Sequence, residues 1–198
     1  MKKIILSLTA LLSIAFANAQ SKSEGFSKGN VFVSGSVGFG STSYDTIKSS
    51  SFSFSPKVAY FVTNNIAIGA KLGFGSSKSD ANPFTTIPTV KSETSTTTFG
   101  VFGRYYATPA SKFSVFGNLG FDYSSENDKL AKVKTNSFDL AVSPGVSYFL
   151  SNHFSMEATF GRLGYTSSKT DEKDAKATNT FGLDVNLSTI SFGLNYKF

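Results

Sequence analysis

Residues that could carry out chemistry are few in this chain of 198 amino acids. The chain contains no cysteine, which excludes thiolate metal ligands, cysteine nucleophiles and disulfides. Its one histidine, His153, lies in a predicted turn, where an imidazole is usually solvated rather than catalytic. Serine is common, but a serine nucleophile requires a base placed beside it. We therefore expect no catalytic residues and a protein that is not an enzyme.

Two segments resemble ligand-binding loops, and both fail the required spacing. Residues 73–79 carry a serine where a phosphate loop needs a glycine before its lysine, and no helical pattern follows. Residues 171–174 read Asp-Glu-Lys-Asp, which mixes charge signs and does not match a calcium loop. The sequence thus predicts no metal site, no cofactor and no nucleic-acid partner.

Other charged residues lie singly inside segments that are apolar at every second position. They are Lys57, Lys71, Arg104, Asp122, Asp139, Glu157, Asp184 and Lys197. Four are basic and four are acidic, and the other residues on their face are mostly Gly, Ser, Thr and Asn. A period of two is typical of a β-strand with one apolar and one polar face. The charges would therefore project from the polar face.

Eight such strands can be placed, which predicts an all-β fold in one domain. They cover residues 30–40, 51–61, 66–75, 96–106, 113–123, 137–149, 154–165 and 179–198. Pro56 interrupts the second strand and predicts a bulge or a local break in pairing. We expect further bulges near Arg162, where the alternation is lost, and near Ser188 or Thr189, where the phase slips before Ile190.

The connections between these strands alternate in length. Residues 41–50, 76–95, 124–136 and 166–178 form long polar loops, whereas residues 62–65, 107–112 and 150–153 form short turns. Each strand is long enough to cross a bilayer when tilted. Transmembrane barrels have long loops outside and short turns in the periplasm, and a soluble sandwich has no reason for this asymmetry.

Aromatic residues lie at the strand ends beside the short turns. An aromatic girdle at the periplasmic membrane–water interface would be formed by Tyr60, Tyr105, Tyr148, Tyr196 and Phe198. Tyr123 and Tyr165 lie at the opposite strand ends, near the outer interface. Aromatic belts at both interfaces are typical of a membrane-spanning barrel.

The last strand has large apolar residues at alternate positions and stops on Phe198. This ending resembles the C-terminal strand of Gram-negative outer-membrane β-barrels, and Arg104-Tyr105-Tyr106 at the end of the fourth strand adds to the likeness. The mature chain is similar to the small OmpA/OmpX-type barrels. The resemblance implies an eight-stranded antiparallel up-and-down transmembrane β-barrel in the cell outer membrane, without a periplasmic domain. It also implies that barrel-assembly machinery recognises the C-terminal strand.

The N-terminus has the pattern of a secretory signal peptide. Lys2 and Lys3 precede an apolar stretch at residues 4–16, and Ala17-Asn18-Ala19 provides a small-residue cleavage site. We expect residues 1–19 to be removed and residues 20–198 to form the barrel domain.

In such a barrel the apolar face meets lipid and the charged face lines the lumen. Eight strands enclose a lumen that side chains just fill. We therefore expect Lys57, Lys71, Arg104, Asp122, Asp139, Glu157 and Lys197 in a packed, salt-bridged interior rather than an open pore. Asp184 is expected above the membrane.

The leading functional hypothesis is a non-enzymatic structural or surface-interaction protein, acting in envelope integrity or adhesion through long extracellular loops. Lysines 129, 132, 134, 169, 173 and 176 in two of these loops could pair with phosphates of outer-membrane lipid, including lipopolysaccharide. One alternative is a narrow, porin-like pore for ions or small solutes, which the inward charges oppose. A lipid-modifying barrel enzyme would need catalytic residues at the outer rim, and His153 is at the other end. A further alternative is a soluble lipocalin-like ligand-binding barrel, which would place the apolar face inside.

Overall fold

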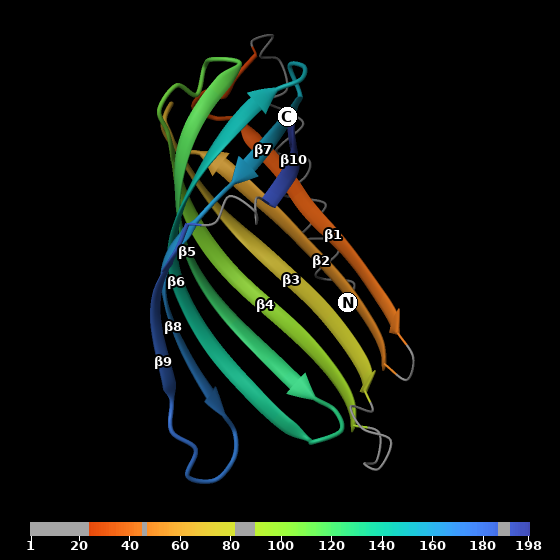
Figure 1. Ribbon diagram of the computed structural model, residues 1–198. Coiled ribbons are helices and arrows are strands. Elements are labelled where there is room, and N and C mark those ends of the chain that lie inside the picture. The colour runs from red at the N-terminus through yellow and green to blue at the C-terminus, as the bar shows by residue number, and fades with distance from the viewer. Residues whose placement is uncertain (1–23, 45–46, 82–89, 186–190) are drawn as a thin grey trace, which may run out of the picture.

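A computed structural model describes residues 24–44, 47–81, 90–185 and 191–198 (Figure 1). Its strands are β1 (Val31–Tyr44), β2 (Ile47–Phe61), β3 (Ile66–Ala81), β4 (Val90–Tyr106), β5 (Phe113–Asp128), β6 (Val133–Phe149), β7 (Phe154–Thr159), β8 (Arg162–Thr170), β9 (Thr178–Asp184) and β10 (Ser191–Lys197). β7 and β8 are two parts of the predicted seventh strand, and β9 and β10 are two parts of the predicted eighth. The predicted signal peptide lies outside the described residues.

None of the described residues forms a helix that is long and apolar enough to cross a membrane.

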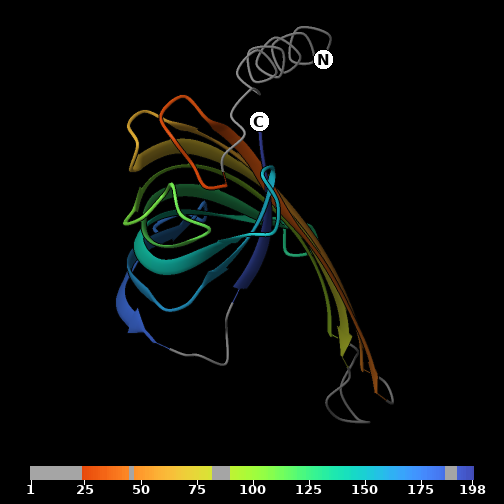
Figure 2. The same ribbon diagram turned by 90° about the horizontal axis from the view of Figure 1, so that it is seen from above.

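The strands form a closed antiparallel barrel, as predicted. Consecutive strands pair from β1 to β6, and both β7 and β8 pair with β6. The ring closes where β10 pairs with β7 on one side and with β1 on the other. This closing contact joins residues 32–35 to residues 194–197, and β1 beyond residue 35 pairs only with β2 among the described residues. Seen from above, the strands form a ring from which the outer ends of β1 to β3 flare away (Figure 2).

The large apolar side chains point away from the barrel axis. Ile68, Leu119 and Leu140, on three different strands, are each about half exposed on the outer surface. A bilayer is the solvent that favours such a surface, and the alternate residues then face the lumen. The lipocalin-like hypothesis is therefore wrong, because it requires the apolar face inside.

The strands are longer than predicted at the end away from the short turns. β1 to β6, β8 and β9 extend into all four predicted long loops, and among the described residues only 129–132 and 171–177 remain as connections there, so the prediction of long loops is wrong. These outer strand segments carry Ser, Thr and Lys on both faces and so lack the alternation that identifies a strand in the membrane. Their backbone groups nevertheless pair, from Lys48 with Asp80 to Asp128 with Val133. The long loops are replaced by paired hairpin arms.

The strand irregularities predicted from the sequence have different outcomes in the structure. At Pro56 the register with β3 is the same on both sides, so there is a local break in pairing but no bulge, because proline lacks the N–H that a ladder requires. Near Arg162 a bulge does occur: β7 ends at Thr159, and the register with β6 shifts by one residue before Leu163. Gly161 adopts φ 73° there. The bulge expected near Ser188 or Thr189 lies outside the described residues.

Two of the short turns are built in the same way. The hydroxyls of Thr63 and Ser151 each accept a hydrogen bond from the backbone N–H three residues later, at 2.9 and 3.1 Å. Such side-chain bonds stabilise turns because they mimic the backbone bond of a turn. The two turns therefore hold the β2–β3 and β6–β7 hairpins in equivalent geometry at the same end of the barrel.

Candidate functional site in the barrel lumen

The lumen at the short-turn end is filled by buried aromatic side chains, here called the aromatic plug. The plug consists of Phe26, Phe32, Phe61, Tyr106, Phe116 and Phe149. Phe26 lies at its centre, with ring centroids 4.7 Å from Phe61 and 4.8 Å from Phe149. Contacts at this spacing leave no room for water between the rings.

Phe26 reaches the lumen on the segment that precedes β1. Its backbone N–H donates to the carbonyl of Pro109 in a short turn at 2.6 Å. Gly25 has φ 96°, and a Cβ there would lie 2.5 Å from the carbonyl carbon of Ala110. Lys197 Nζ donates to the Gly25 carbonyl at 2.7 Å. Only glycine fits at position 25, so the insertion of Phe26 into the lumen requires a glycine directly before it.

A buried ion pair lies beside the plug. Arg104 Nη1 is 2.6 Å from Glu157 Oε2, and both side chains are almost fully buried. Arg104 also donates to the Tyr106 hydroxyl at 3.1 Å, and its guanidinium carbon lies 4.1 Å from the centroid of the Phe116 ring. Asn195 Nδ2 donates to the same Glu157 oxygen at 3.2 Å. Hydrogen bonds to both partners offset much of the cost of burying these charges.

Further from the short turns, one level of the lumen carries a charged row. Its members are direct cross-strand neighbours from β1 to β8: Ser34, Lys57, Lys71, Gly100, Asp122, Asp139 and Thr166. Lys71 Nζ lies 2.6 Å from Asp122 Oδ2, although β4 separates their strands. Gly100 makes this possible, because a Cβ there would collide with both side chains.

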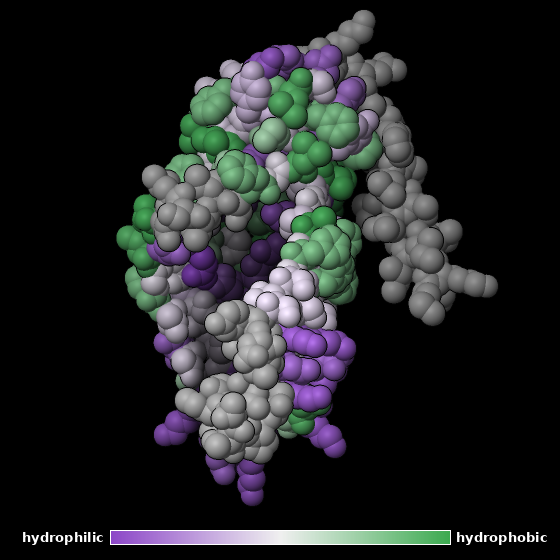
Figure 3. Space-filling model, turned by 45° about the vertical axis from the view of Figure 1, so that its right-hand side comes forward, coloured by the Kyte–Doolittle hydropathy of each residue, from purple (hydrophilic) through white to green (hydrophobic). Residues whose placement is uncertain are grey.

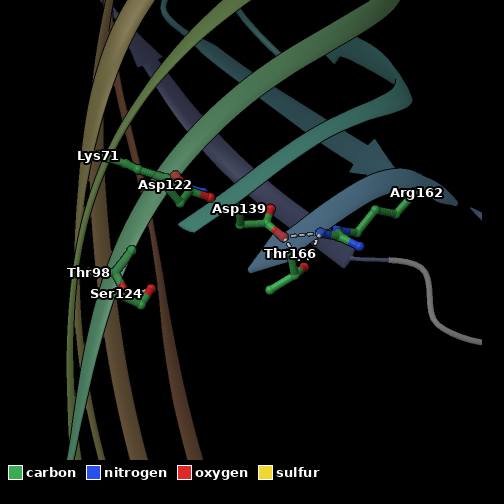
Figure 4. A network of polar contacts seen from close by, with 7 residues as sticks. All are labelled: Lys71, Thr98, Asp122, Ser124, Asp139, Arg162 and Thr166. Carbon is green, nitrogen blue, oxygen red and sulfur yellow. Dashed lines mark hydrogen bonds and ion pairs between the residues drawn. The ribbon is translucent and has the colours of Figure 1, made fainter. Parts of the chain in front are cut away.

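Asp139, the other carboxylate of the charged row, pairs with an arginine side chain. Asp139 Oδ2 pairs with Arg162 Nη2 and accepts from the Thr166 hydroxyl at 2.7 Å. Figure 4 shows these three side chains meeting at β6 and β8, and Lys71 pointing toward Asp122. The positive members of the row thus lie on β2 and β3, and the negative members lie on β5 and β6.

The next level outward carries a hydroxyl row. It consists of Ser36, Ser55, Thr98, Ser124, Ser137 and Ser168, with Gly73 on β3. The Thr98 and Ser124 hydroxyls are 2.8 Å apart, and those of Ser137 and Ser168 are 3.0 Å apart. Both pairs bridge adjacent strands, so this level of the lumen wall consists largely of hydroxyl groups.

Between the two rows lies a cavity of about 600 Å³, here called the vestibule. Its lining includes all four charged members of the charged row and most of the hydroxyl row. The space-filling view shows the molecule hollowed on one face, with hydrophilic residues in the hollow (Figure 3). The prediction of a fully packed interior is therefore wrong for the outer half of the lumen.

The structure places the remaining predicted residues as follows. Lys57 is half-buried in the vestibule wall, and Lys197 is buried beside the plug. Asp184 is exposed on β9. The girdle residues Tyr60, Tyr105, Tyr148 and Tyr196 point outward at the short-turn end, and Phe198 packs edge-on against Tyr196 at 4.9 Å.

His153 is not simply solvated, as the sequence suggested. Its Nδ1 lies 2.9 Å from the Lys197 carbonyl oxygen, and its ring stacks on Tyr196. The turn brings it against the last strand, so the imidazole has a packing role there. Among the described residues, no three His, Asp or Glu side chains come together in a group that could hold a metal ion.

The sequence interpretation missed the aromatic plug. Three pairs of adjacent aromatics, Tyr60-Phe61, Tyr105-Tyr106 and Tyr148-Phe149, carry the signal, because neighbours in a strand face opposite sides. One member of each pair must therefore point into the lumen. Phe26 has no such signal, since it precedes the first strand. Arg162 was missed as a partner of Asp139 because the alternation fails at the bulge beside it.

Fold and lumen together define a small membrane-spanning barrel with a polar interior. Residues 7–198 match the family model of the outer membrane protein β-barrel domain, and the chain belongs to this family. The protein is an eight-stranded β-barrel of the outer membrane.

Two solved structures are similar to this chain, and the first shares its fold. The outer membrane protein OprG from Pseudomonas aeruginosa superposes with a TM-score of 0.55 at 16% identity, over 89% of this chain and 99% of OprG. Neisserial surface protein A superposes with a TM-score of 0.43 at 15% identity, over 86% of this chain and 100% of that protein. A search of curated proteins finds no match.

Proposed function

We propose that this protein is a non-enzymatic surface-interaction protein whose lumen is a blind vestibule rather than a pore. Short turns of outer-membrane barrels face the periplasm, so the plug would close the periplasmic end and the vestibule would face outward. The observation that carries the proposal is the burial of Phe26, which is 2% exposed at the centre of the plug.

The plug and the ion pair together oppose a water path. Phe26 contacts aromatic rings on β1, β2, β4 and β6, so it spans the lumen rather than lining one wall. Arg104 and Glu157 occupy space beside it with their hydrogen-bonding groups turned to each other. An ion crossing this layer would lose its hydration without replacement contacts, which is strongly unfavourable.

Single-channel recording in planar bilayers tests the proposal. The wild-type barrel is expected to give no steady conductance, whereas Phe26→Ala removes the central ring and is expected to conduct. Phe39→Ala is the matched control, because Phe39 is 79% exposed on the outer surface of β1. Steady conductance by the wild type, equal to that of Phe26→Ala, would favour the narrow pore instead.

We also propose anionic lipopolysaccharide as a partner of the hairpin arms. Lys132 and Lys134 on the β5–β6 arm and Lys169, Lys173 and Lys176 on the β8–β9 arm are exposed, and β6 pairs with β8. Basic side chains gathered on neighbouring arms can pair with lipid phosphates. Replacing these five lysines by Gln should weaken binding to lipopolysaccharide micelles. Dephosphorylated lipopolysaccharide should bind the wild type and the variant equally.

A further inference from the structure

Two lysines stand side by side on the lumen wall. Lys57 and Lys71 are direct cross-strand partners on β2 and β3, and both line the vestibule. Like charges in this arrangement destabilise a sheet unless other charges offset them. Asp122 offsets Lys71 at 2.6 Å. Lys57 makes no hydrogen bond or ion pair with any residue that the structure describes.

The remaining charges at this level are matched one to one. Lys71 pairs with Asp122, and Arg162 pairs with Asp139. The nearest deeper carboxylate, Glu157, is already paired with Arg104. Lys57 therefore leaves one positive charge in excess in the vestibule. A half-buried ammonium is stabilised by an anion within reach, so the wall has a place for one negative charge.

Hydroxyl groups adjoin this excess charge. Ser55 lies two residues before Lys57 on the same face of β2. Ser36 on β1 is the direct cross-strand partner of Ser55. Thr98 and Ser124 continue the row across the lumen. Each hydroxyl can both donate and accept, so the row suits a ligand that carries hydroxyl groups of its own. The volume of about 600 Å³ is in the size range of small-molecule sites.

We propose that the vestibule binds a small polyhydroxylated monoanion of the sugar-acid type. Its carboxylate pairs with Lys57, and its hydroxyls bond to Ser36, Ser55 and the rest of the hydroxyl row. A single negative charge matches the single excess positive charge. This inference rests on the proposed outward-facing, blind vestibule, since a ligand must enter from the outside and be retained.

Calorimetric titration of the folded barrel in detergent micelles tests the inference with three probes. Glucuronate carries both features, glucose carries hydroxyls without charge, and acetate carries charge without hydroxyls. Glucuronate should bind at least tenfold more tightly than either, because glucose lacks the charge that pairs with Lys57 and acetate lacks the hydroxyls that bond to the hydroxyl row. Lys57→Gln should remove that advantage, and Lys57→Arg should retain it. Lys48→Gln, at the exposed outer end of β2, should bind like the wild type.

Four results would overturn the inference. They are no binding of glucuronate, equal binding of glucuronate and glucose, equal binding of glucuronate and acetate, or glucuronate binding that Lys57→Gln leaves unchanged. Binding retained in Lys57→Arg shows that the loss in Lys57→Gln comes from the missing positive charge. The proposed function is tested separately by conductance: a conducting wild type that binds glucuronate through Lys57 would refute the blind vestibule alone.

Discussion

At the scale of single residues, the buried Arg104–Glu157 pair should be sensitive to substitution, because the charge of each partner is compensated by the other. Arg104→Met or Glu157→Leu alone leaves one buried charge uncompensated and is expected to cost about 3–5 kcal/mol in the free energy of unfolding. The double variant should be less destabilised than either single variant, since both charges are gone. Urea titration of the barrel in lipid vesicles measures all three.

The exposed pair of Lys78 and Glu93 provides the control. Its atoms are 3.3 Å apart, but the Lys78 side chain is 62% exposed. Lys78→Met should change the free energy of unfolding by only about 0–1 kcal/mol, because solvent screens the pair. Equal losses at the exposed and buried pairs would show that Arg104 and Glu157 do not form a desolvated pair.

The lumen residues show what the period-two pattern of the strands can predict and what it cannot. A period of two placed Lys71, Asp122 and Asp139 on one face, but it could not say which charges would pair. The Lys71–Asp122 pair spans an intervening strand and depends on Gly100, so it requires the register of three strands. The partner of Asp139 is Arg162, which lies at a bulge where a period of two gives no direction.

At the scale of elements, the break between β7 and β8 depends on one glycine. Gly161 has φ 73°, and a Cβ there would lie 3.1 Å from the Asp184 carbonyl oxygen. Gly161→Ala should destabilise the barrel by about 1–2 kcal/mol, because an L-residue is strained in this conformation. Gly182→Ala on β9 is the control, since no atom lies within 4 Å of its Cβ position. The same urea titration measures both, and equal stability of the two variants would contradict the assigned role of Gly161.

The outward face of the strands gives a second prediction at this scale. Leu119 lies near the middle of β5 and is 51% exposed, whereas Leu130 lies in the turn after β5 and is 54% exposed. Leu119→Arg should cost about 2–4 kcal/mol, because arginine would face the bilayer core. Leu130→Arg introduces the same residue at the same exposure outside the membrane and should cost little. Unfolding in lipid vesicles distinguishes them, and equal costs would mean that β5 does not face lipid as assigned.

The eight strands and their outward face could be predicted from sequence because the bilayer imposes an alternation on every residue that crosses it. The hairpin arms could not, because both of their faces meet water and their sequence resembles a loop. The bulge expected near Ser188 or Thr189 lies between β9 and β10, outside the described residues. These failures occur where the bilayer no longer constrains the sequence, or where a bulge resets the phase.

At the scale of the whole molecule, the two ends of the barrel differ in what holds them together. The short-turn end has the closing β1–β10 contact, the aromatic plug and the buried ion pair. The other end has the vestibule and the polar hairpin arms. The aromatic packing and the closing strand contact thus lie at the short-turn end, whereas the cavity and the polar arms lie at the other.

Closure of the whole barrel depends on β10, which Phe198 directly follows. Its backbone N–H donates to the Val31 carbonyl at 2.9 Å, and its ring packs on Tyr196. If the assembly machinery recognises this end, Phe198→Ala should reduce the fraction inserted in the outer membrane and leave unfolded protein in the periplasm. Phe181→Ala is the matched control, because Phe181 is a 72% exposed aromatic on β9. Cell fractionation, with the mobility shift on boiling as the test of folding, measures the outcome. Refolding of purified Phe198→Ala in detergent separates assembly from stability: a variant that also fails to refold there would show that Phe198 acts through barrel closure, and normal insertion in cells would exclude a role in recognition.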